Sequence, residues 1–477
     1  MRRTLRALGL ACLTSLAFAA FVRGTARAES AATTSSPLTL DEVLSAAEKS
    51  FPLLKAAALE RDVAEADLLS AEGGFDLSWK TRGTLTPVGY YESLRAESVV
   101  EKPTSLWGVS GFAGWKYGRG DFATYNGSQQ TLEYGEVRAG VNVPIWRNGP
   151  IDRRRANLAR AELGQDIAAL SVKDQRIQVR RAATHRYWAW VAAGAKVAIA
   201  KDLLAIVEDR DAGLATRVER GDLPKIERTD NARAIEQRRA QLALARRSLE
   251  QASIELGLYL RDAEGRATLP PENRLPSALA EPSADDGATP NSDTAFALGA
   301  RPELRRFRLQ MAQNVVEMDW AKNQLMPGID VQLAGSQDLG RAMPSRPDLS
   351  KPVFEATLML DIPIQTRAMR GRRDAAAFTL RRIERQVDFA NDRVRADVQD
   401  AHSALRGARE RIVATRKEVV LARELEEAER TRFAQGDSHL LIVNLREQQT
   451  AEAELREVDA LLDFHRAVAD RKAARGE

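Results

Sequence analysis

The 477-residue chain repeats one plan of elements twice, and this duplication restricts its fold more than any other feature. Three landmarks recur: Phe51-Pro52 as Arg301-Pro302, Val143-Pro144-Ile145 as Ile362-Pro363-Ile364, and Gly221-Asp222 as Gly436-Asp437. The spacing between the copies is 250, 219 and 215 residues at these landmarks in turn. A nearly constant spacing is expected of an internal duplication. The drop of 31 residues places extra strand or loop in the first copy.

Each copy predicts a short helix, a β section and a long helical hairpin, so the predicted fold class is mostly α with β. The predicted boundaries are 29–260 for the first repeat (β section 75–146, turn near Gly221), 261–300 for a linker, and 301–477 for the second repeat (β section 328–364, turn near Gly436). The linker is rich in Pro, Ala, Ser and Asp and is predicted to be irregular.

Apolar and small residues recur along the long helices with the period of a left-handed coiled coil. In the second copy their average separation is 3.5 residues, at Leu380, Ile383, Val387, Ala390, Val394, Val398, Ala401, Leu405, Ala408, Ile412, Thr415, Val419 and Ala422. A helix of about 65 to 70 residues is on the order of 100 Å long, longer than a compact domain needs. Several shorter helices, broken at Gly194, Gly213 or Gly407, are the alternative.

The β sections have the composition of a membrane-facing sheet. The first holds 12 of the chain's 27 aromatic residues: Phe75, Trp79, Tyr90, Tyr91, Trp107, Phe112, Trp115, Tyr117, Phe122, Tyr125, Tyr134 and Trp146. The residues that alternate with polar or small ones are Val137, Ala139, Val141, Val143 and Ile145, with a looser series at Val353, Ala356, Leu358 and Leu360. Aromatic girdles and such alternation are typical of outer-membrane barrels. A small soluble β-sandwich is the alternative.

The number of strands limits how such a barrel closes. The helices on either side of a β section must return to the same side of the membrane, so each section contributes an even number of strands. Two per section give four per chain, fewer than the eight or so that close a barrel, although the first section could hold four. We therefore expect a transmembrane β-barrel shared between protomers, and a trimer with four strands per chain would have twelve.

The first 28 residues are predicted to be a secretory signal peptide. Three arginines precede an apolar run from Ala7 to Val22, and Ala26-Arg27-Ala28 is a small-x-small cleavage site. The run is shorter than the roughly 20 residues of a membrane anchor, and it continues well past Cys12, which disfavours a lipoprotein. The whole chain has 71 basic and 67 acidic residues, and the segment contains five arginines and no acid. Its removal leaves 66 basic and 67 acidic residues. That balance argues against a nucleic-acid partner held by bulk charge.

The sequence contains no catalytic constellation, and we expect neither an enzyme nor a cofactor. The four histidines are scattered without metal-ligand spacing, and no P-loop or nucleophile elbow is present. His439, beside the second turn, is most simply a solvated residue. After the signal no segment reaches 18 uninterrupted apolar residues, so no transmembrane helix is expected. Crossing a bilayer would then require strands closed into a barrel.

In the order and spacing of its motifs the chain resembles the TolC family of outer-membrane channel proteins, which serve tripartite efflux pumps and type I secretion systems. The matching positions are Leu40-x-x-x-Leu44-x-x-Ala47, Pro144 and Pro363 at the exits from strand to helix, Arg217-x-x-x-Gly221, Arg432-Phe433-x-x-Gly436, and Asn444-Leu445-Arg446-Glu447-Gln448. The resemblance covers nearly the whole chain after the signal.

The resemblance implies a passive exit duct: a homotrimer with a twelve-stranded barrel in the outer membrane and a periplasmic tunnel of helices about 100 Å long. The implied partners are a periplasmic adaptor protein, an inner-membrane pump and outer-membrane lipid. The cargo stays open, as does the choice between efflux and secretion. A periplasmic adaptor is the alternative function, but adaptors have one coiled-coil hairpin where this chain has two.

Members of the family close the tunnel at the helical turns, where acidic residues and an aromatic residue surround the constriction. The candidates here are Asp222, Glu227, Phe433 and Asp437, with Gly221 and Gly436 in the turns themselves. The position six residues after Gly436 is Ile442 instead of an acid, so the gate residues of the second repeat stay open. Asp222 and Asp437 have a second interpretation as helix caps. Glu227 is expected one turn inside its helix and is the better candidate for lining the pore.

Overall fold

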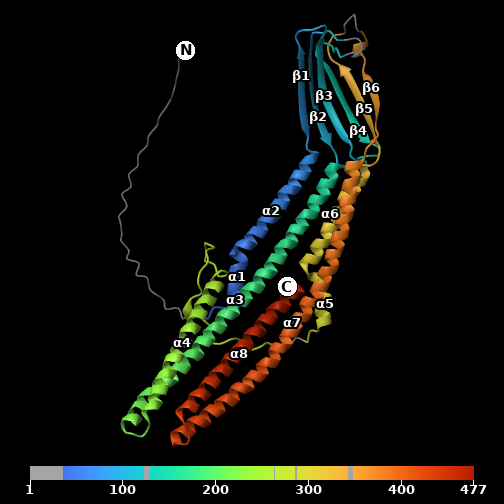
Figure 1. Cartoon of the computed structure of the whole chain (residues 1–477). Coiled ribbons are helices and arrows are strands. Elements are labelled where there is room, and N and C mark those ends of the chain that lie inside the picture. Colours follow the sequence, from blue (N-terminus) through green and yellow to red (C-terminus); the bar gives the residue numbers. More distant parts are fainter. Residues whose placement is uncertain (1–35, 123–128, 263, 285–286, 342–346) are drawn as a thin grey trace, which may run out of the picture. The chain divides into compact units, whose positions relative to one another are not determined.

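The computed structural model describes residues 36–122, 129–262, 264–284, 287–341 and 347–477. The predicted signal peptide and Tyr125 lie outside these ranges. Within the unit Pro37–Glu477, the strands gather at one end and the two hairpin turns lie at the other (Figure 1).

Both repeats contain the same kinds of element in the same order. The first has helices α1 (Leu40–Ser50) and α2 (Pro52–Glu72), strands β1 (Ser78–Thr86), β2 (Ser93–Pro103), β3 (Ser110–Gly120) and β4 (Glu136–Pro144), and helices α3 (Arg153–Glu219) and α4 (Lys225–Gly257). The second has helices α5 (Pro290–Ala300) and α6 (Pro302–Asn323), strands β5 (Gly328–Asp338) and β6 (Val353–Asp361), and helices α7 (Arg367–Gln435) and α8 (Leu440–Arg475). Short 3-10 turns occupy Gly73–Phe75, Glu272–Arg274 and Pro347–Ser350.

Helices α3 and α7 are continuous over 67 and 69 residues, so the alternative of several shorter helices is wrong. At about 1.5 Å per residue each is on the order of 100 Å long. Gly194 lies inside α3, where a Cβ atom would come within 2.5 Å of the Leu275 side chain. This glycine therefore lets the linker approach α3 closely instead of ending the helix. No helix in the described ranges has a stretch long and apolar enough to span a membrane.

The predicted seam of α7 is its buried side. Of the thirteen seam positions nine are buried and none is exposed. Small residues such as Ala401 and Ala408 allow the neighbouring helices to approach closely. Ion pairs flank the seam against α8, for example Arg423 with Glu454 at 2.7 Å and Arg456 with Glu418 at 2.8 Å. Such partly exposed pairs contribute about 1 kcal/mol at most, so the apolar seam supplies most of the packing energy.

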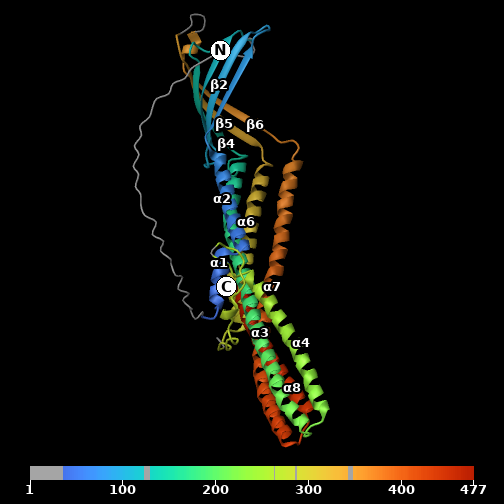
Figure 2. The same ribbon diagram turned by 90° about the vertical axis from the view of Figure 1, so that its left-hand side faces the viewer.

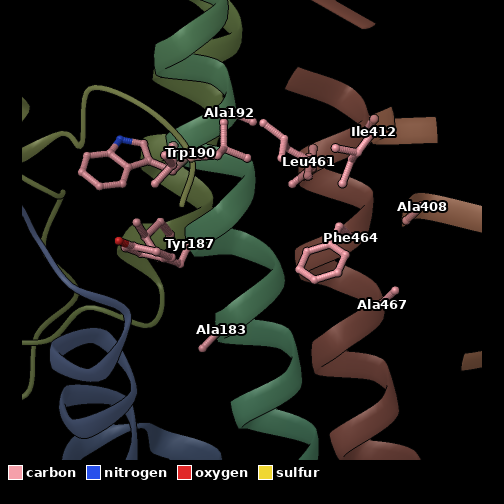
Figure 3. Packing of buried hydrophobic residues seen from close by; sticks show 14 of the residues in the cluster. Ala183, Tyr187, Trp190, Ala192, Ala408, Ile412, Leu461, Phe464 and Ala467 are labelled. Carbon is pink, nitrogen blue, oxygen red and sulfur yellow. The ribbon is translucent and has the colours of Figure 1, made fainter. Parts of the chain in front are cut away.

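The largest hydrophobic cluster joins the middle of α3 to α7 and α8 (Figure 3). Trp190 of α3 and Phe464 of α8 are each 1% exposed. The Tyr187 hydroxyl donates a hydrogen bond to the Leu38 carbonyl at 2.9 Å, which ties the segment before α1 to α3. Truncating Trp190 to Ala would cost about 3–5 kcal/mol. Because α3 belongs to the first repeat and α7 and α8 to the second, this cluster holds the repeats together.

The linker contains a helix, α5, so the prediction of an irregular segment over 261–300 is wrong for its last eleven residues. Thr289 forms a capping box with Ser292, and Pro290 begins the helix, where its missing N–H costs nothing. α1 is capped by Thr39 and also has eleven residues, 250 positions earlier. α5 is therefore the second copy of α1, and the Pro- and Ser-rich composition concealed a helix start.

Within the described residues, six strands form one open antiparallel sheet in the order β1-β2-β3-β4-β5-β6. Figure 2 shows this sheet beyond the ends of α2 and α6. Among the described residues the first β section contains four strands and the second two, so the first holds the larger of the two numbers that the sequence left open. The landmarks align β4 with β6, and β1 follows α2 as β5 follows α6. The hairpin β2–β3 therefore accounts for most of the 31 extra residues of the first copy. Within the described residues, β1 and β6 are the free edges.

Candidate functional site

The sheet has two chemically different faces. Directly opposite residues of neighbouring antiparallel strands place their side chains on the same face, and successive residues alternate. The pairing register therefore assigns every strand residue to a face, starting from the row Trp79, Val100, Ala113, Ala139, Gly335 and Phe354.

The face that contains Trp79 is apolar across all six strands. Its members include Leu85, Leu94, Ala96, Val100, Ala113, Trp115, Tyr117, Val137, Ala139, Val141, Val143, Val331, Leu333, Phe354, Ala356, Leu358 and Leu360. Trp79 is 75% exposed and Phe354 87%, so this face is uncovered in the single chain. The charged residues on it, Lys102 and Arg119, stand one position from a strand end. A band of this kind is what hydrocarbon requires.

The opposite face is polar and charged. Its ionisable members are Lys80, Arg82, Arg95, Glu97, Glu101, Lys116, Glu136, Arg138, Asp330, Asp338, Glu355 and Asp361. Lys80 pairs with Glu101 at 2.9 Å, and Lys116 pairs with Glu136 at 3.1 Å. A face of this composition suits water, whereas the face that contains Trp79 suits an apolar environment.

The alternation predicted from sequence matches this assignment with one exception. Val137, Ala139, Val141 and Val143 share the apolar face, as the register shows. Val353, however, falls on the polar face, because Phe354 opposes Gly335 and takes the apolar position. The looser spacing of the second series concealed this shift by one residue.

Aromatic side chains lie at both ends of the sheet. Trp107, in the turn between β2 and β3, and Trp146, just after β4, are each 49% exposed on the side of the helices. Tyr90 and Tyr91 lie in the β1–β2 turn at the opposite end, and Tyr90 is 98% exposed. Amphipathic rings at two levels are typical of strands that cross from one membrane interface to the other.

At the hairpin turns, the chain reverses on glycines in the left-handed conformation. Gly221 has φ +80° and Gly436 has φ +87°, values that residues with a Cβ rarely adopt. After α7, the Gly436 N–H donates to the Phe433 carbonyl at 3.1 Å, and the Asp437 N–H donates to the Arg432 carbonyl at 2.9 Å. These bonds satisfy carbonyls that the helix end leaves free.

The interpretation of Asp222 and Asp437 as helix caps is wrong. α4 and α8 have Pro224 and His439 as N-caps, and neither residue makes a side-chain cap hydrogen bond. Each aspartate lies two residues before the N-cap, because the turns are longer than the sequence suggested. Glu227 also lies closer to the helix start than expected, in the first turn of α4.

Carboxylates and one aromatic ring are thus gathered at the turns. Asp222 and Asp437 are exposed and Glu227 is half-buried. No ion pair within the described ranges involves any of these three carboxylates. Phe433 of α7 is covered by the Arg217 guanidinium of α3, whose carbon lies 5.8 Å from the ring centroid. The two hairpins therefore touch beside their turns.

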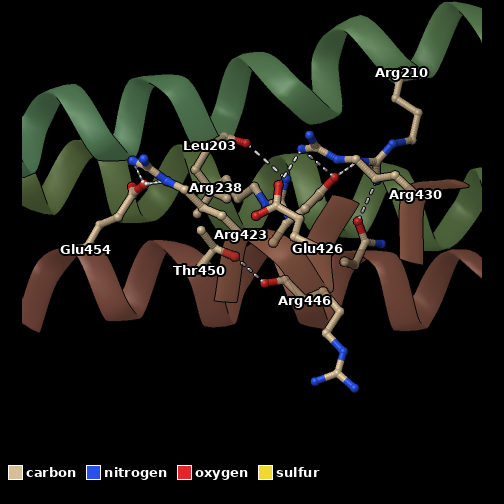
Figure 4. Close-up of polar contacts among 11 residues, drawn as sticks. Leu203, Arg210, Arg238, Arg423, Glu426, Arg430, Arg446, Thr450 and Glu454 are labelled. Carbon is tan, nitrogen blue, oxygen red and sulfur yellow. Dashed lines mark hydrogen bonds and ion pairs between the residues drawn. The ribbon is translucent and has the colours of Figure 1, made fainter. Parts of the chain in front are cut away.

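A buried charge cluster, hereafter the Glu447 cluster, joins all four hairpin helices. Glu447 of α8 is 1% exposed and pairs with Arg210 of α3, with Arg238 of α4 at 3.0 Å, and with Arg430 of α7 at 3.3 Å. Figure 4 shows these three arginines with Leu203, whose carbonyl accepts a hydrogen bond from Arg238 at 2.9 Å. One carboxylate therefore links the first hairpin to the second.

Burial sets the energetics of the Glu447 cluster. Burial lowers the pKa of Arg210, and the nearby Arg238 and Arg430 lower it further, whereas Glu447 opposes both effects. An arginine pKa starts so high that Arg210 stays charged. The cluster is therefore stable only as a set, because removal of Glu447 would leave buried guanidinium groups without their counter-ion.

Sequence reasoning missed the role of Glu447. A signal was present, because Glu447 occupies a position in the buried seam of α8, between Val443 and Ala451. A charged residue at a seam position of a coiled coil commonly fixes partner and register. The sequence alone could not identify the arginines that reach it, since they come from three other helices.

The remaining predicted positions lie between the sheet and the helices. Pro144 is the last residue of β4 and Pro363 follows β6, so both precede the long helices α3 and α7. In the part of the chain that the structure describes, no group of three or more His, Cys, Asp or Glu side chains could hold a metal ion.

No protein-family model matches the sequence, and no curated protein matches it. Solved structures do match the fold. VceC, an outer membrane protein of Vibrio cholerae, has a TM-score of 0.65 and 13% identity over 92% of this chain and 96% of its own. The open MtrE outer membrane channel of Neisseria gonorrhoeae has a TM-score of 0.63 and 16% identity over 92% of this chain and 88% of its own. CusC, studied for its transmembrane channel formation, has a TM-score of 0.64 and 14% identity over 91% of both chains.

The chain has the fold of outer-membrane channels. The resemblance to the TolC family predicted this fold, and its mostly helical architecture with a sheet is confirmed.

Proposed function

We propose that the protein is a passive exit duct of the outer membrane, in a tripartite efflux pump or a type I secretion system. The observation that carries the proposal is the two-faced sheet at one end of helices on the order of 100 Å long. The apolar face suits lipid and the polar face suits a water-filled interior. The long hairpins would form the wall of a periplasmic tunnel.

The proposed assembly is a homotrimer with a shared barrel. The open sheet exposes the backbone edges of β1 and β6, and unpaired edges are an energetic liability that a barrel removes. Pairing β1 of one copy with β6 of the next closes the sheet into a ring. The same arrangement covers the exposed sides of the helices by neighbouring hairpins.

The hairpin turns are the proposed constriction. By three-fold symmetry Asp222, Glu227 and Asp437 would each form a ring of three carboxylates, with Phe433 beside them. The three carboxylates have no ion-pair partners in the described chain, which supports a role in cation binding at the pore entrance. The Glu447 cluster would set how tightly the two hairpins of each protomer hold together.

The proposed partners are a periplasmic adaptor and an inner-membrane pump, and the proposed location is the outer membrane after export on the signal peptide of residues 1–28. The alternative function, an adaptor with a coiled-coil hairpin, fits the chain less well. Two long hairpins and a sheet with an uncovered apolar face have no use in a soluble adaptor.

Fractionation of a Gram-negative host that expresses the full chain tests the proposal. We expect the protein in the outer-membrane fraction, and light scattering of the detergent-extracted protein should give the mass of a trimer. Recovery in the soluble periplasm, or a stable monomer with intact β content, would contradict the proposal.

A further inference from the structure

The hairpin β2–β3 distinguishes the two repeats of this chain, and it is built like the rest of the sheet. β2 and β3 each have eleven residues, a length that crosses a membrane when tilted. β2 pairs along the whole of β1, from Ser78 opposite Glu101 to Thr86 opposite Ser93. The hairpin is therefore an integral part of the wall and not a flap on its surface.

Most side chains of this hairpin follow the same division into faces, with Val99 and Phe112 on the polar face as exceptions. Leu94, Ala96 and Val100 of β2 and Trp115 and Tyr117 of β3 extend the apolar face. On the polar face, Glu97 stands directly opposite Arg82 of β1 and Lys116 of β3. A hairpin outside the membrane wall would need neither the apolar band nor the charged row.

We propose that this hairpin widens the membrane segment, so that the trimer forms a ring of eighteen strands, three times the six of each chain. The inference rests on the proposed function, and it replaces the twelve strands that four per chain would give. With strands about 4.8 Å apart and tilted by about 40°, twelve strands make a ring about 24 Å across and eighteen make one about 36 Å across. The wider segment admits bulkier hydrated cargo.

The structure also suggests a variant in which the hairpin β2–β3 alone is deleted. The Asp121 N–H donates a hydrogen bond to the Glu92 carbonyl at 2.8 Å, across the base of the hairpin. Excision of residues 93–120 can therefore join Glu92 to Asp121 with little movement. β1 would then shift by two strand spacings, about 10 Å, to lie beside β4, antiparallel and with both apolar faces on the same side, as β5 lies beside β6.

Sizing with neutral polyethylene glycols in planar bilayers tests the inference. The polymers are added only on the side of the bilayer opposite the hairpin turns. They then enter the pore through the sheet and report on the width of the membrane segment. We expect the radius of the largest polymer that lowers conductance to be about 6 Å smaller in the deletion variant than in the full chain, half the difference of the two diameters. Electron microscopy of the full-length trimer measures the ring directly, should the deletion variant fail to fold.

The outcomes separate the two proposals. Equal polymer cut-offs in both proteins, or a full-length ring about 24 Å across, would overturn the eighteen-stranded ring and leave the channel function intact. A folded full-length protein that forms neither trimers nor pores would overturn the channel function, and the ring with it.

Discussion

Replacing Glu447 by Ala should loosen the contact between the two hairpins of each protomer. The side chain of Glu447 is fully buried, and those of Arg238 and Arg210 are 6% and 16% exposed. Breaking a buried pair by removing one partner typically costs about 3–5 kcal/mol, because the remaining charge is left uncompensated. Here one carboxylate serves three arginines, of which Arg430 also pairs with a second carboxylate, that of Glu426 at 2.6 Å, and is itself partly exposed.

Hydrogen exchange followed by mass spectrometry measures this loss of local stability in the helices where it occurs. A cost of about 3 kcal/mol corresponds to a more than hundredfold rise in local opening. We expect amides of α4 and α8 around the cluster to lose protection by about that factor, while amides around Trp190 in the central hydrophobic cluster keep theirs.

Glu454→Ala is the matched control. Glu454 lies on the same helix and binds one arginine, Arg423, at 2.7 Å, but that arginine is 65% exposed. Such a pair is worth about 1 kcal/mol at most, so protection should change less than tenfold. Equal losses in the two variants, or no loss in Glu447→Ala, would refute the reasoning that burial makes the cluster a lock between hairpins.

Three further predictions concern the sheet, the turns and the core. Leu358→Lys on the apolar face should cost about 2–4 kcal/mol and reduce membrane insertion, whereas Thr357→Lys on the other face should not; equal insertion would contradict the face assignment. Glu227→Gln should reduce block by divalent or trivalent cations applied from the periplasmic side in conductance recordings, with the trimer intact; unchanged block there, with block abolished in Asp437→Asn, would move the constriction to the second turn. Burial lowers the pKa of His465, so unfolding takes up a proton and stability falls as the pH drops below about 6.5; His465→Gln should flatten that dependence in thermal melts, and an unchanged slope would contradict it.

The duplication and the coiled-coil period made the architecture predictable from sequence. Both depend on spacing along the chain, which the sequence records directly, and the burial of the α7 seam follows from them. The glycines inside the long helices misled only because close packing, as at Gly194 against Leu275, also favours glycine.

The errors arose where the outcome depends on contacts with a second segment, or on a shift of one or two residues in where an element begins. The additional hairpin β2–β3 required a count of strands in a region where turns and strands share Gly and aromatic residues. The cap interpretation of Asp222 and Asp437 failed because the turns extend two residues further, to Pro224 and His439.

Conductance of the purified full-length protein in planar lipid bilayers tests the central claim most directly. The channel account predicts discrete, long-lived current steps from detergent-extracted trimers, with block by cations added at the side of the hairpin turns. Protein that is folded by circular dichroism and inserted in the membrane, yet passes no current even in the Glu447→Ala variant, would contradict it.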